Sequence, residues 1–364
     1  MTLKQLSLLN YRNYKYQDIS FCDNLNILIG DNAQGKTNIL EAIFVLAFTK
    51  KLYGNHDRAF IKYDEEFCRI KGLLKFADGV DKFECALSKQ TKKLKINGNE
   101  VIKVANYVSL INVIMFSPMD MNLIKNGPSF RRKFLNMEIS QLDNKYVNLV
   151  NNFNVILKIR NELLRNYSIS FDKSYFEVIT DKFISLSNDI YKYRSNFINN
   201  INSYISSIFS SIVGTGDLSL EYLSSVIIGD NYSDNLREKL IANFDKELLY
   251  KSSLYGPHRD DFSFLLNKRN LANYGSQGQQ KSAILSLKLA EIELFSQMKK
   301  ERPIVLLDDI FSELDDKRNN SLINYLQSDM QIIMTTTSIN SIKKELLKNA
   351  KVFEVENGNV KEMI

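Results

Sequence analysis

The phosphate-binding pattern G-x-x-x-x-G-K-[ST] is the feature that most constrains the fold of this chain. It is filled by Gly30, Asp31, Asn32, Ala33, Gln34, Gly35, Lys36 and Thr37. Residues 25–29 suit a short buried strand, and residues 38–48 carry apolar side chains at helical spacing. A strand, a glycine loop and a helix start direct backbone N–H groups and a helix dipole at one point. We expect this loop to bind a nucleoside triphosphate, with Lys36 on the β- and γ-phosphates and the Thr37 hydroxyl on Mg²⁺.

A pair of carboxylates near the other end of the chain completes this chemistry. Residues 304–307 are four apolar residues, and Asp308 and Asp309 follow them directly. A buried strand that ends in this way is a Walker B motif, which would bring Asp308 to the Mg²⁺ held by Thr37. Asp309 would then polarise the attacking water. We therefore predict an ATP-hydrolysing site with Lys36, Asp308 and Asp309 as its catalytic residues and Thr37 and Asp308 as its metal ligands.

Length and composition limit the remaining function classes. A chain of 364 residues is too long for one compact core. No apolar run reaches the roughly 18–20 residues that cross a bilayer, and the N-terminus lacks an apolar signal segment, so no membrane role is expected. The 3 cysteines form no C-x-x-C pair and there are 2 histidines, which argues against zinc and favours the reducing cytoplasm. The net charge of +6 is weak support for a polyanionic partner.

The periodicity of apolar residues predicts a discontinuous α/β head. Strand patterns lie at 3–8, 67–76, 82–87, 93–96 and 100–104, with a hairpin signal at Asn97-Gly98. Two heptad-like stretches, 135–156 and 176–208, are separated by polar residues at 166–174. They predict either an antiparallel helical hairpin or two core helices of a small separate domain. We assign residues 1–127 and 217–364 to a mixed-sheet ATPase head, and residues 128–216 to a helical lobe.

Two further motifs resemble those of the ATP-binding-cassette superfamily. Ser312, Leu314 and Asp315 match its D-loop, S-x-L-D, and Ser276, Gly278 and Gln279 match its signature, L-S-G-G-Q, with Gln277 in place of the first glycine. The signature precedes a predicted helix over 281–296, so it lies at a helix N-terminus. One subunit cannot easily bring both motif sets to one γ-phosphate. We therefore expect an ATP-dependent homodimer in which each copy caps the nucleotide of the other with Ser276, Gly278 and Gln279.

The order of motifs along the whole chain resembles the RecF family of bacterial replication and repair ATPases. Besides the motifs above, residues 9–14 read L-N-Y-R-N-Y and residues 256–261 read G-P-H-R-D-D. The resemblance implies an ATP-binding-cassette-type P-loop head interrupted by an antiparallel helical hairpin. It implies Arg12 and Asn13 near the nucleotide, and binding to duplex DNA and single-strand/duplex junctions at gaps. It further implies action with RecO and RecR to load RecA, support of the SOS response, and a cytoplasmic, nucleoid-associated protein.

Departures from related ATPases set further expectations. The strand predicted over 331–334 is followed by Thr335-Thr336-Thr337, so the switch histidine of transporters is missing. Asp309 stands where transporters usually have glutamate, and the shorter carboxylate predicts slow hydrolysis. The family resemblance further implies that DNA stimulates this hydrolysis. We expect His258 to be structural and Arg259 to pair with Asp260 or Asp261.

Two alternative functions stay open at this point. A transporter ATPase subunit is disfavoured by the helical insertion between the Walker motifs. A long-armed chromosome-maintenance protein is disfavoured because that insertion is short. Basic residues could contact DNA if they shared one surface: Lys50, Lys51, Arg58, Lys89, Lys92, Lys93, Lys95, Arg131, Arg132 and Lys133.

Overall fold

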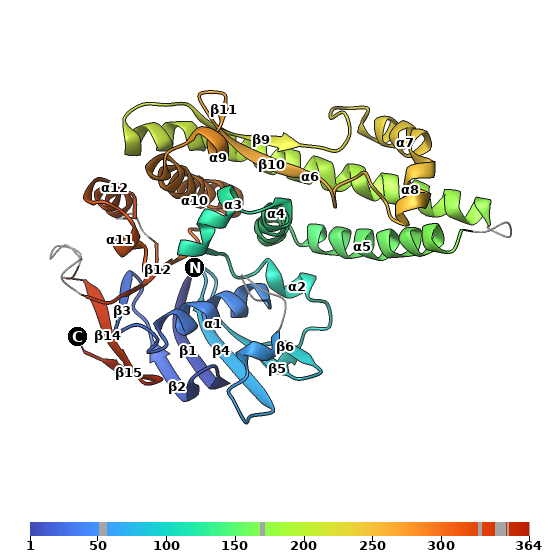
Figure 1. Ribbon diagram of the computed structural model, residues 1–364. Helices are drawn as coiled ribbons and strands as arrows, with labels where there is room; N and C mark the ends of the chain where they lie inside the picture. The colour runs from blue at the N-terminus through green and yellow to red at the C-terminus, as the bar shows by residue number, and fades with distance from the viewer. Residues whose placement is uncertain (51–56, 168–171, 327–329, 339–346, 348, 364) are drawn as a thin grey trace. The chain divides into compact units, whose positions relative to one another are not determined.

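The computed structural model describes residues 1–364 except 51–56, 168–171, 327–329, 339–346, 348 and 364 (Figure 1). The side chains of Asp57, Arg58, Glu313 and Asp316 also lie outside the description. The chain forms two compact units. The first contains Met1–Met121, Ile208–Thr215 and Lys281–Ile364, and the second contains Asn122–Ser207 and Gly216–Gln280. None of the helices in the described part of the chain combines the length and the apolar character that a bilayer span needs.

The first unit has an antiparallel sheet in the order β2-β1-β4-β5-β6-β7. Its strands are β1 (Thr2–Tyr11), β2 (Tyr14–Ser20), β4 (Phe67–Lys75), β5 (Val80–Ser88), β6 (Lys92–Ile96) and β7 (Asn99–Glu100). Asn97 and Gly98 have φ of 51° and 86°, as the predicted hairpin turn between β6 and β7 requires. The strand expected over 100–104 is wrong beyond Glu100, because β7 ends there and the chain turns into α2 (Ala105–Val108).

The second sheet of this unit carries the predicted nucleotide motifs. Its order is β15-β14-β3-β13-β12-β8, and all neighbours are parallel except the edge strand β15. The strands are β3 (Leu25–Ile29), β8 (Val113–Phe116), β12 (Ile304–Asp308), β13 (Ile332–Thr336), β14 (Ala350–Glu356) and β15 (Asn359–Glu362). Parallel strands end at the same edge, so the loops after β3, β12 and β13 lie together.

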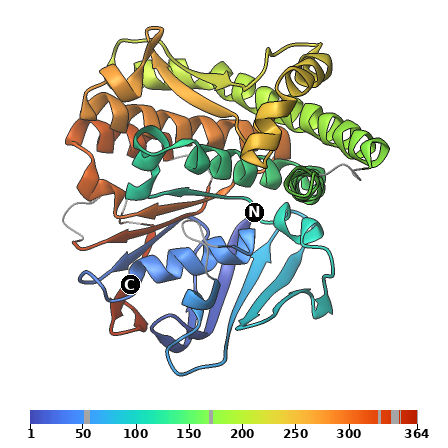
Figure 2. The ribbon, with the colours of Figure 1, turned by 45° about the vertical axis from the view of Figure 1, so that its right-hand side comes forward.

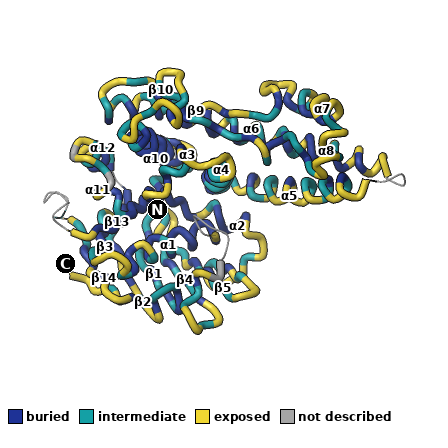
Figure 3. The backbone as a smooth tube through the Cα atoms, in the orientation of Figure 1, coloured by how far each residue is buried: buried dark blue, intermediate teal, exposed yellow. Residues whose placement is uncertain are grey.

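Helices pack these two sheets into one core. Helix α1 (Lys36–Phe48) contacts β4 and β5 of the first sheet and β8, β12 and β13 of the second (Figure 2). It is therefore buried on most sides, and its trace in Figure 3 is mostly dark blue. The other helical elements in the described part of this unit are α2, η1 (Asp57–Phe60), η2 (Pro118–Met121), α11 (Ile310–Glu313), α12 (Asp316–Leu326), the end of α6 (Lys173–Val213) from Ile208 and the part of α10 (Gln277–Lys299) from Lys281.

The second unit is helical, with one small sheet in the order β11-β10-β9. Its helices are α3 (Asn122–Lys125), α4 (Pro128–Leu142), α5 (Asn144–Arg165), α6 (Lys173–Val213, as far as Ser207), α7 (Tyr232–Ala242), α8 (Phe244–Tyr250) and α9 (Leu271–Tyr274), and α10 (Gln277–Lys299) starts there. Its strands are β9 (Leu218–Leu223), β10 (Asp261–Leu266) and β11 (Arg269–Asn270).

Helices α5 and α6 form an antiparallel pair. The Tyr146 ring of α5 lies 5.2 Å from the Tyr193 ring of α6, and the Phe153 ring of α5 stacks on the Phe183 ring of α6 at 5.4 Å. A later residue of α5 thus contacts an earlier residue of α6, as in an antiparallel pair. The predicted helical hairpin is thus present, but the heptad stretch over 135–156 is not one helix. It breaks at Asp143, whose extended backbone ends α4 and whose side chain accepts the Lys145 N–H at the start of α5.

The compact units divide the chain differently from the expected domains. Residues 216–280 group with the helices, although we placed nearly all of them in the head. The physical reason is side-chain bonding to α6: the Asn202 amide donates to the Leu220 carbonyl and accepts the Leu220 N–H, both at 2.8 Å. These bonds hold β9, and with it β10, on the long helix.

Candidate nucleotide site

The phosphate-binding loop between β3 and α1 has the backbone that its glycines predict. Gly35 has a φ of 114°, and a Cβ there would lie 2.4 Å from the Asn13 Nδ2 atom. A Cβ on Gly30 would lie 2.2 Å from the Val355 carbonyl oxygen. Only glycine fits at these two positions, because other segments of the same chain, at Asn13 and Val355, lie too close to the loop to leave room for a side chain.

Lys36 is the buried cation of this loop. Only 6% of the residue is exposed, and its Nζ donates to the Gly30 carbonyl at 2.5 Å and the Asp31 carbonyl at 2.7 Å. Burial lowers the pKa of the Lys36 amine, and the nearby charges of Asp309 and Asp308 oppose that shift. A triphosphate would act in the same direction as these carboxylates and keep the amine charged.

Asp308 and Thr37 form the predicted metal-binding pair. The Thr37 hydroxyl donates to Asp308 Oδ1 at 2.8 Å, and the Thr335 hydroxyl donates to the same oxygen at 3.0 Å. Asp308 is 8% exposed, and burial raises its pKa, against the lowering effect of both hydroxyls. A hydroxyl and a carboxylate are the hard oxygen ligands that Mg²⁺ takes together with substrate phosphates. The pair therefore fits a magnesium ion.

Thr335 is a further residue of this site, to which the sequence analysis assigned no role. We noted it only for the missing histidine, yet it also accepts the Asp309 N–H at 2.9 Å. That contact fixes Asp309, which has a φ of 51° and starts α11. The sequence did contain a signal for this contact. Thr335 is a polar residue at the end of β13, and β13 pairs in parallel with β12, which ends at Asp308.

Arg12 and Asn13 lie at the turn between β1 and β2, and both touch the loop or the helix that follows it. The Arg12 guanidinium pairs with Glu41 of α1 at 2.6 Å and lies 5.4 Å from the centre of the Phe60 ring. The Asn13 amide donates to the Gln34 carbonyl at 3.0 Å. Tyr14, to which the sequence analysis assigned no role, donates its hydroxyl to the Gly35 carbonyl at 3.0 Å. The turn is thus part of the wall of the loop.

The signature motif forms the start of helix α10 in the second unit. Ser276 Oγ accepts the Gln279 N–H at 3.2 Å, and Gln279 Oε1 accepts the Ser276 N–H at 2.9 Å. This is a capping box, in which two residues satisfy each other's backbone N–H groups at a helix N-terminus. Ser276 is exposed and Gly278 follows it in the first turn. The Ser276 hydroxyl is the acceptor in this box, so the box does not use its proton.

The G-P-H-R-D-D stretch serves as a structural junction of the second unit. Asp260 accepts the Tyr222 hydroxyl at 2.7 Å and the Ser225 N–H at 2.8 Å, and Asp261 pairs with Arg131 at 2.6 Å. The expectation that Arg259 pairs with one of these carboxylates was wrong, because both are bound by other groups. Arg259 instead lies against the Ser253 carbonyl at 3.3 Å.

His258 has the structural role that we expected. Its Nε2 lies 2.9 Å from the Ser253 carbonyl, and its ring lies 6.0 Å from both Phe153 and Phe183. Burial lowers the pKa of His258 to about 4. The ring is therefore neutral at physiological pH and donates its Nε2 proton to Ser253.

Some of the predicted DNA-contacting residues have intramolecular partners. Arg131 binds Asp261, Arg132 donates to the Asp260 carbonyl at 2.9 Å, and Lys92 donates to the Thr49 carbonyl. Lys51 and the side chain of Arg58 lie outside the described residues. Lys89 and Lys93 are exposed, so contact with DNA by them stays a prediction.

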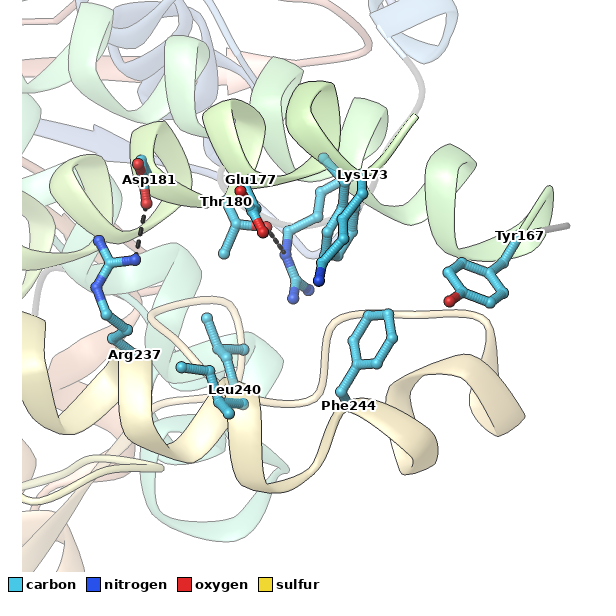
Figure 4. Close-up of a pocket in the computed structure, with 11 residues that line it drawn as sticks. Tyr167, Lys173, Glu177, Thr180, Asp181, Arg237, Leu240 and Phe244 are labelled. Atoms are coloured by element: carbon cyan, nitrogen blue, oxygen red, sulfur yellow. Dashed lines mark hydrogen bonds and ion pairs between the residues drawn. The ribbon is translucent and has the colours of Figure 1, made fainter. Parts of the chain in front are cut away.

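A separate cavity of about 820 Å³ lies within the second unit (Figure 4). It is lined by α6, α7 and neighbouring residues, and none of the predicted site residues lines it. Arg237 and Asp181 pair across it at 2.8 Å. At its wall the buried Arg160 binds Glu247 and Ser253, both at 2.6 Å. This network supports the loop that leads into Gly256.

The comparison with known proteins decides the family. The family model described as RecF/RecN/SMC N terminal domain matches residues 2–361. The DNA replication and repair protein RecF of Macrococcus caseolyticus (strain JCSC5402) is 40% identical over 366 residues, covering 99% of each chain. This chain belongs to the RecF family. The RecF protein of Bacillus cereus (strain G9842) is 39% identical over 368 residues, covering 99% of this chain and 98% of the relative.

Solved structures of RecF confirm the predicted fold class. A structure described as the recombination mediator protein RecF-ATP in the RecFOR pathway has a TM-score of 0.92 at 32% identity, covering 100% of this chain and 97% of its own. The RecF-ATPrS structure gives the same score and identity. An Smc head bound to a domain of ScpA, at 14% identity and a TM-score of 0.57, shares the fold alone. The α/β head interrupted by an antiparallel helical lobe is the architecture of the RecF family.

Proposed function

We propose that this chain is an ATP-dependent DNA clamp of recombinational repair. Two copies close on DNA at single-strand gaps when each holds MgATP, and slow hydrolysis releases them. In this role the protein acts with RecO and RecR to load RecA, and it supports replication and the SOS response. The membership in the RecF family and the RecF-ATP relative support this proposal.

The arrangement of Lys36, Thr37 and Asp308 is the single observation that carries the ATP part. A buried amine lies at the loop carbonyls, and a hydroxyl lies 2.8 Å from a buried carboxylate at the shared edge of parallel strands. These are the groups that hold the β- and γ-phosphates and their Mg²⁺ in P-loop ATPases. Lys36 would stabilise the charge on the transferring phosphoryl group, and Asp309 would orient the attacking water.

The exposed Ser276 supports the homodimer. Its hydroxyl and the first N–H groups of α10 form an anion-binding helix start, which would cap the γ-phosphate of a second copy. Because the closed dimer contains two such composite sites, ATP would hold the copies together. The loss of γ-phosphate would remove the bridging group, and opening would follow.

Sedimentation velocity with ATP and a gapped duplex tests the proposal. Wild type is expected to shift from monomer to dimer only with ATP, and to remain with the DNA. Lys36→Met should abolish ATP binding and dimerisation together, whereas Ser276→Arg should keep ATP binding and lose the dimer. Wild type that stays monomeric with both ligands, or a Ser276→Arg protein that still dimerises, would refute the clamp. A transporter-type ATPase would instead hydrolyse ATP at the same rate with and without DNA.

A further inference from the structure

The side chain of Gln34, inside the phosphate-binding loop, faces the C-terminal hairpin. The Asn357 N–H, in the turn between β14 and β15, donates to Gln34 Oε1 at 2.7 Å. The next N–H along, that of Gly358, donates to the Gln34 carbonyl at 3.3 Å. The same carbonyl also accepts the Asn13 amide at 3.0 Å. One loop residue is therefore bonded to two turns, the turn at Asn13 and the turn at Asn357, and Asn357 lies 323 positions from Gln34 in the sequence.

The C-terminal turn fits closely against this region. Asn357 and Gly358 have φ of 48° and 75°, the left-handed pair of a tight hairpin turn. A Cβ on Gly358 would lie 2.8 Å from the Asn13 carbonyl oxygen. Val355, two residues before the turn, has its carbonyl against the Cα of Gly30. The loop is thus enclosed by the β1–β2 turn and by the β14–β15 turn.

We propose that Gln34 is a positioning residue that joins the phosphate-binding loop to the turn of the C-terminal hairpin, so that this turn sets the affinity for ATP. The inference rests on the proposed ATP binding of the same loop. A phosphate cradle works through the directions of its backbone N–H groups, and small displacements of these groups weaken anion binding. Gln34 immediately precedes Gly35 and Lys36, so its two contacts fix the direction in which the chain enters α1.

The hairpin also has a second anchor, which provides a matched control. Gln17 of β2 accepts the Val360 N–H at 2.9 Å and donates to the Val360 carbonyl at 3.3 Å. These bonds hold β15 on β2, and Gln17 makes no contact with the phosphate-binding loop among the described residues. A change at Gln17 removes this contact of β15 with β2 and leaves the Gln34–Asn357 contact at the turn in place.

The test compares Gln34→Ala, Gln34→Met and Gln17→Ala by calorimetric ATP titration and steady-state hydrolysis. Gln34→Met keeps the length of the side chain and lacks the acceptor oxygen. We expect both Gln34 variants to raise the Kd and the KM for ATP by about tenfold, the effect of one lost polar contact and a less fixed loop. The kcat should remain within about twofold, because Lys36, Asp308 and Asp309 are unchanged. Gln17→Ala should bind ATP as wild type does.

Amide hydrogen exchange supplies a measurement that a merely structural role would not change. In wild type, ATP should slow exchange at the N–H groups of Asn357 and Gly358, and in Gln34→Met this slowing should be absent. Unchanged ATP affinity in both Gln34 variants would overturn the inference, and so would an equal loss in Gln17→Ala. If wild type itself fails to bind ATP, the proposed function fails first, which is a different result.

Discussion

His258 gives a pH dependence of stability that follows directly from its surroundings. The folded protein lowers the pKa of His258 from 6.5 to about 4, because the ring is buried beside two phenylalanines. Between these values the unfolded chain binds a proton that the folded chain does not, so stability falls as the pH drops through this window. From pH 8 to pH 5 the loss from this one group is about 2 kcal/mol.

Urea denaturation of wild type and His258→Gln at pH 8 and pH 5 measures this loss. Glutamine does not titrate, and its amide nitrogen can still donate to the Ser253 carbonyl. We expect the free energy of unfolding of wild type to fall by about 2 kcal/mol more than that of the variant over this interval. The chain has 2 histidines, so ring resonances in a labelled sample assign the titration with little overlap. Equal pH dependence of the two proteins, or a His258 resonance that titrates near 6.5, would refute the reasoning.

Two further substitutions probe the two units separately. Asp308→Asn should lower Mg²⁺-dependent ATP hydrolysis by at least about a hundredfold. The same change should raise the melting temperature of the ligand-free protein at neutral pH. Burial raises the pKa of Asp308, so its ionised form destabilises the folded state, and asparagine carries no charge. An unchanged or lower melting temperature would contradict this. Arg160→Met should destabilise the protein by about 3–5 kcal/mol in urea, since Glu247 is left buried without its partner, and Arg160→Met/Glu247→Leu should recover most of that loss. A double variant no more stable than the single one would argue against the pair.

The sequence predicted the parts of the site that depend on local pattern. The loop between residues 30 and 37 has the predicted strand before it and the predicted helix after it. Each of these three elements is recognised from the residue pattern within a short stretch of sequence. The apolar run before Asp308 predicts a buried strand, and parallel pairing then places its end beside Thr37. The helix after the signature was also predicted, but from Lys281, whereas α10 begins at Gln277. The capping box of Ser276 and Gln279, a local pattern that the sequence analysis did not use, marks that earlier start.

The rest depends on contacts between distant segments. Thr335 donates a hydrogen bond to Asp308 from the neighbouring strand. Arg131 donates to Asp261, which lies 130 residues away in the sequence. No pattern within a short window selects such a partner from several similar residues. The break at Asp143 was missed for a related reason. Heptad spacing continues across it, and the stop is imposed by a side chain that bonds to the backbone instead of continuing the helix.

Complementation between two inactive variants tests the shared ATP sites most directly. Lys36→Met lacks the loop half of the site, and Ser276→Arg lacks the signature half. Each protein alone should be inactive in DNA-stimulated hydrolysis. An equal mixture should recover activity, up to about half that of wild type, because neither variant pairs with itself and each mixed pair holds one intact site of two. A mixture as inactive as its components, or full activity of Ser276→Arg alone, would contradict the claim that two copies complete each other's nucleotide sites.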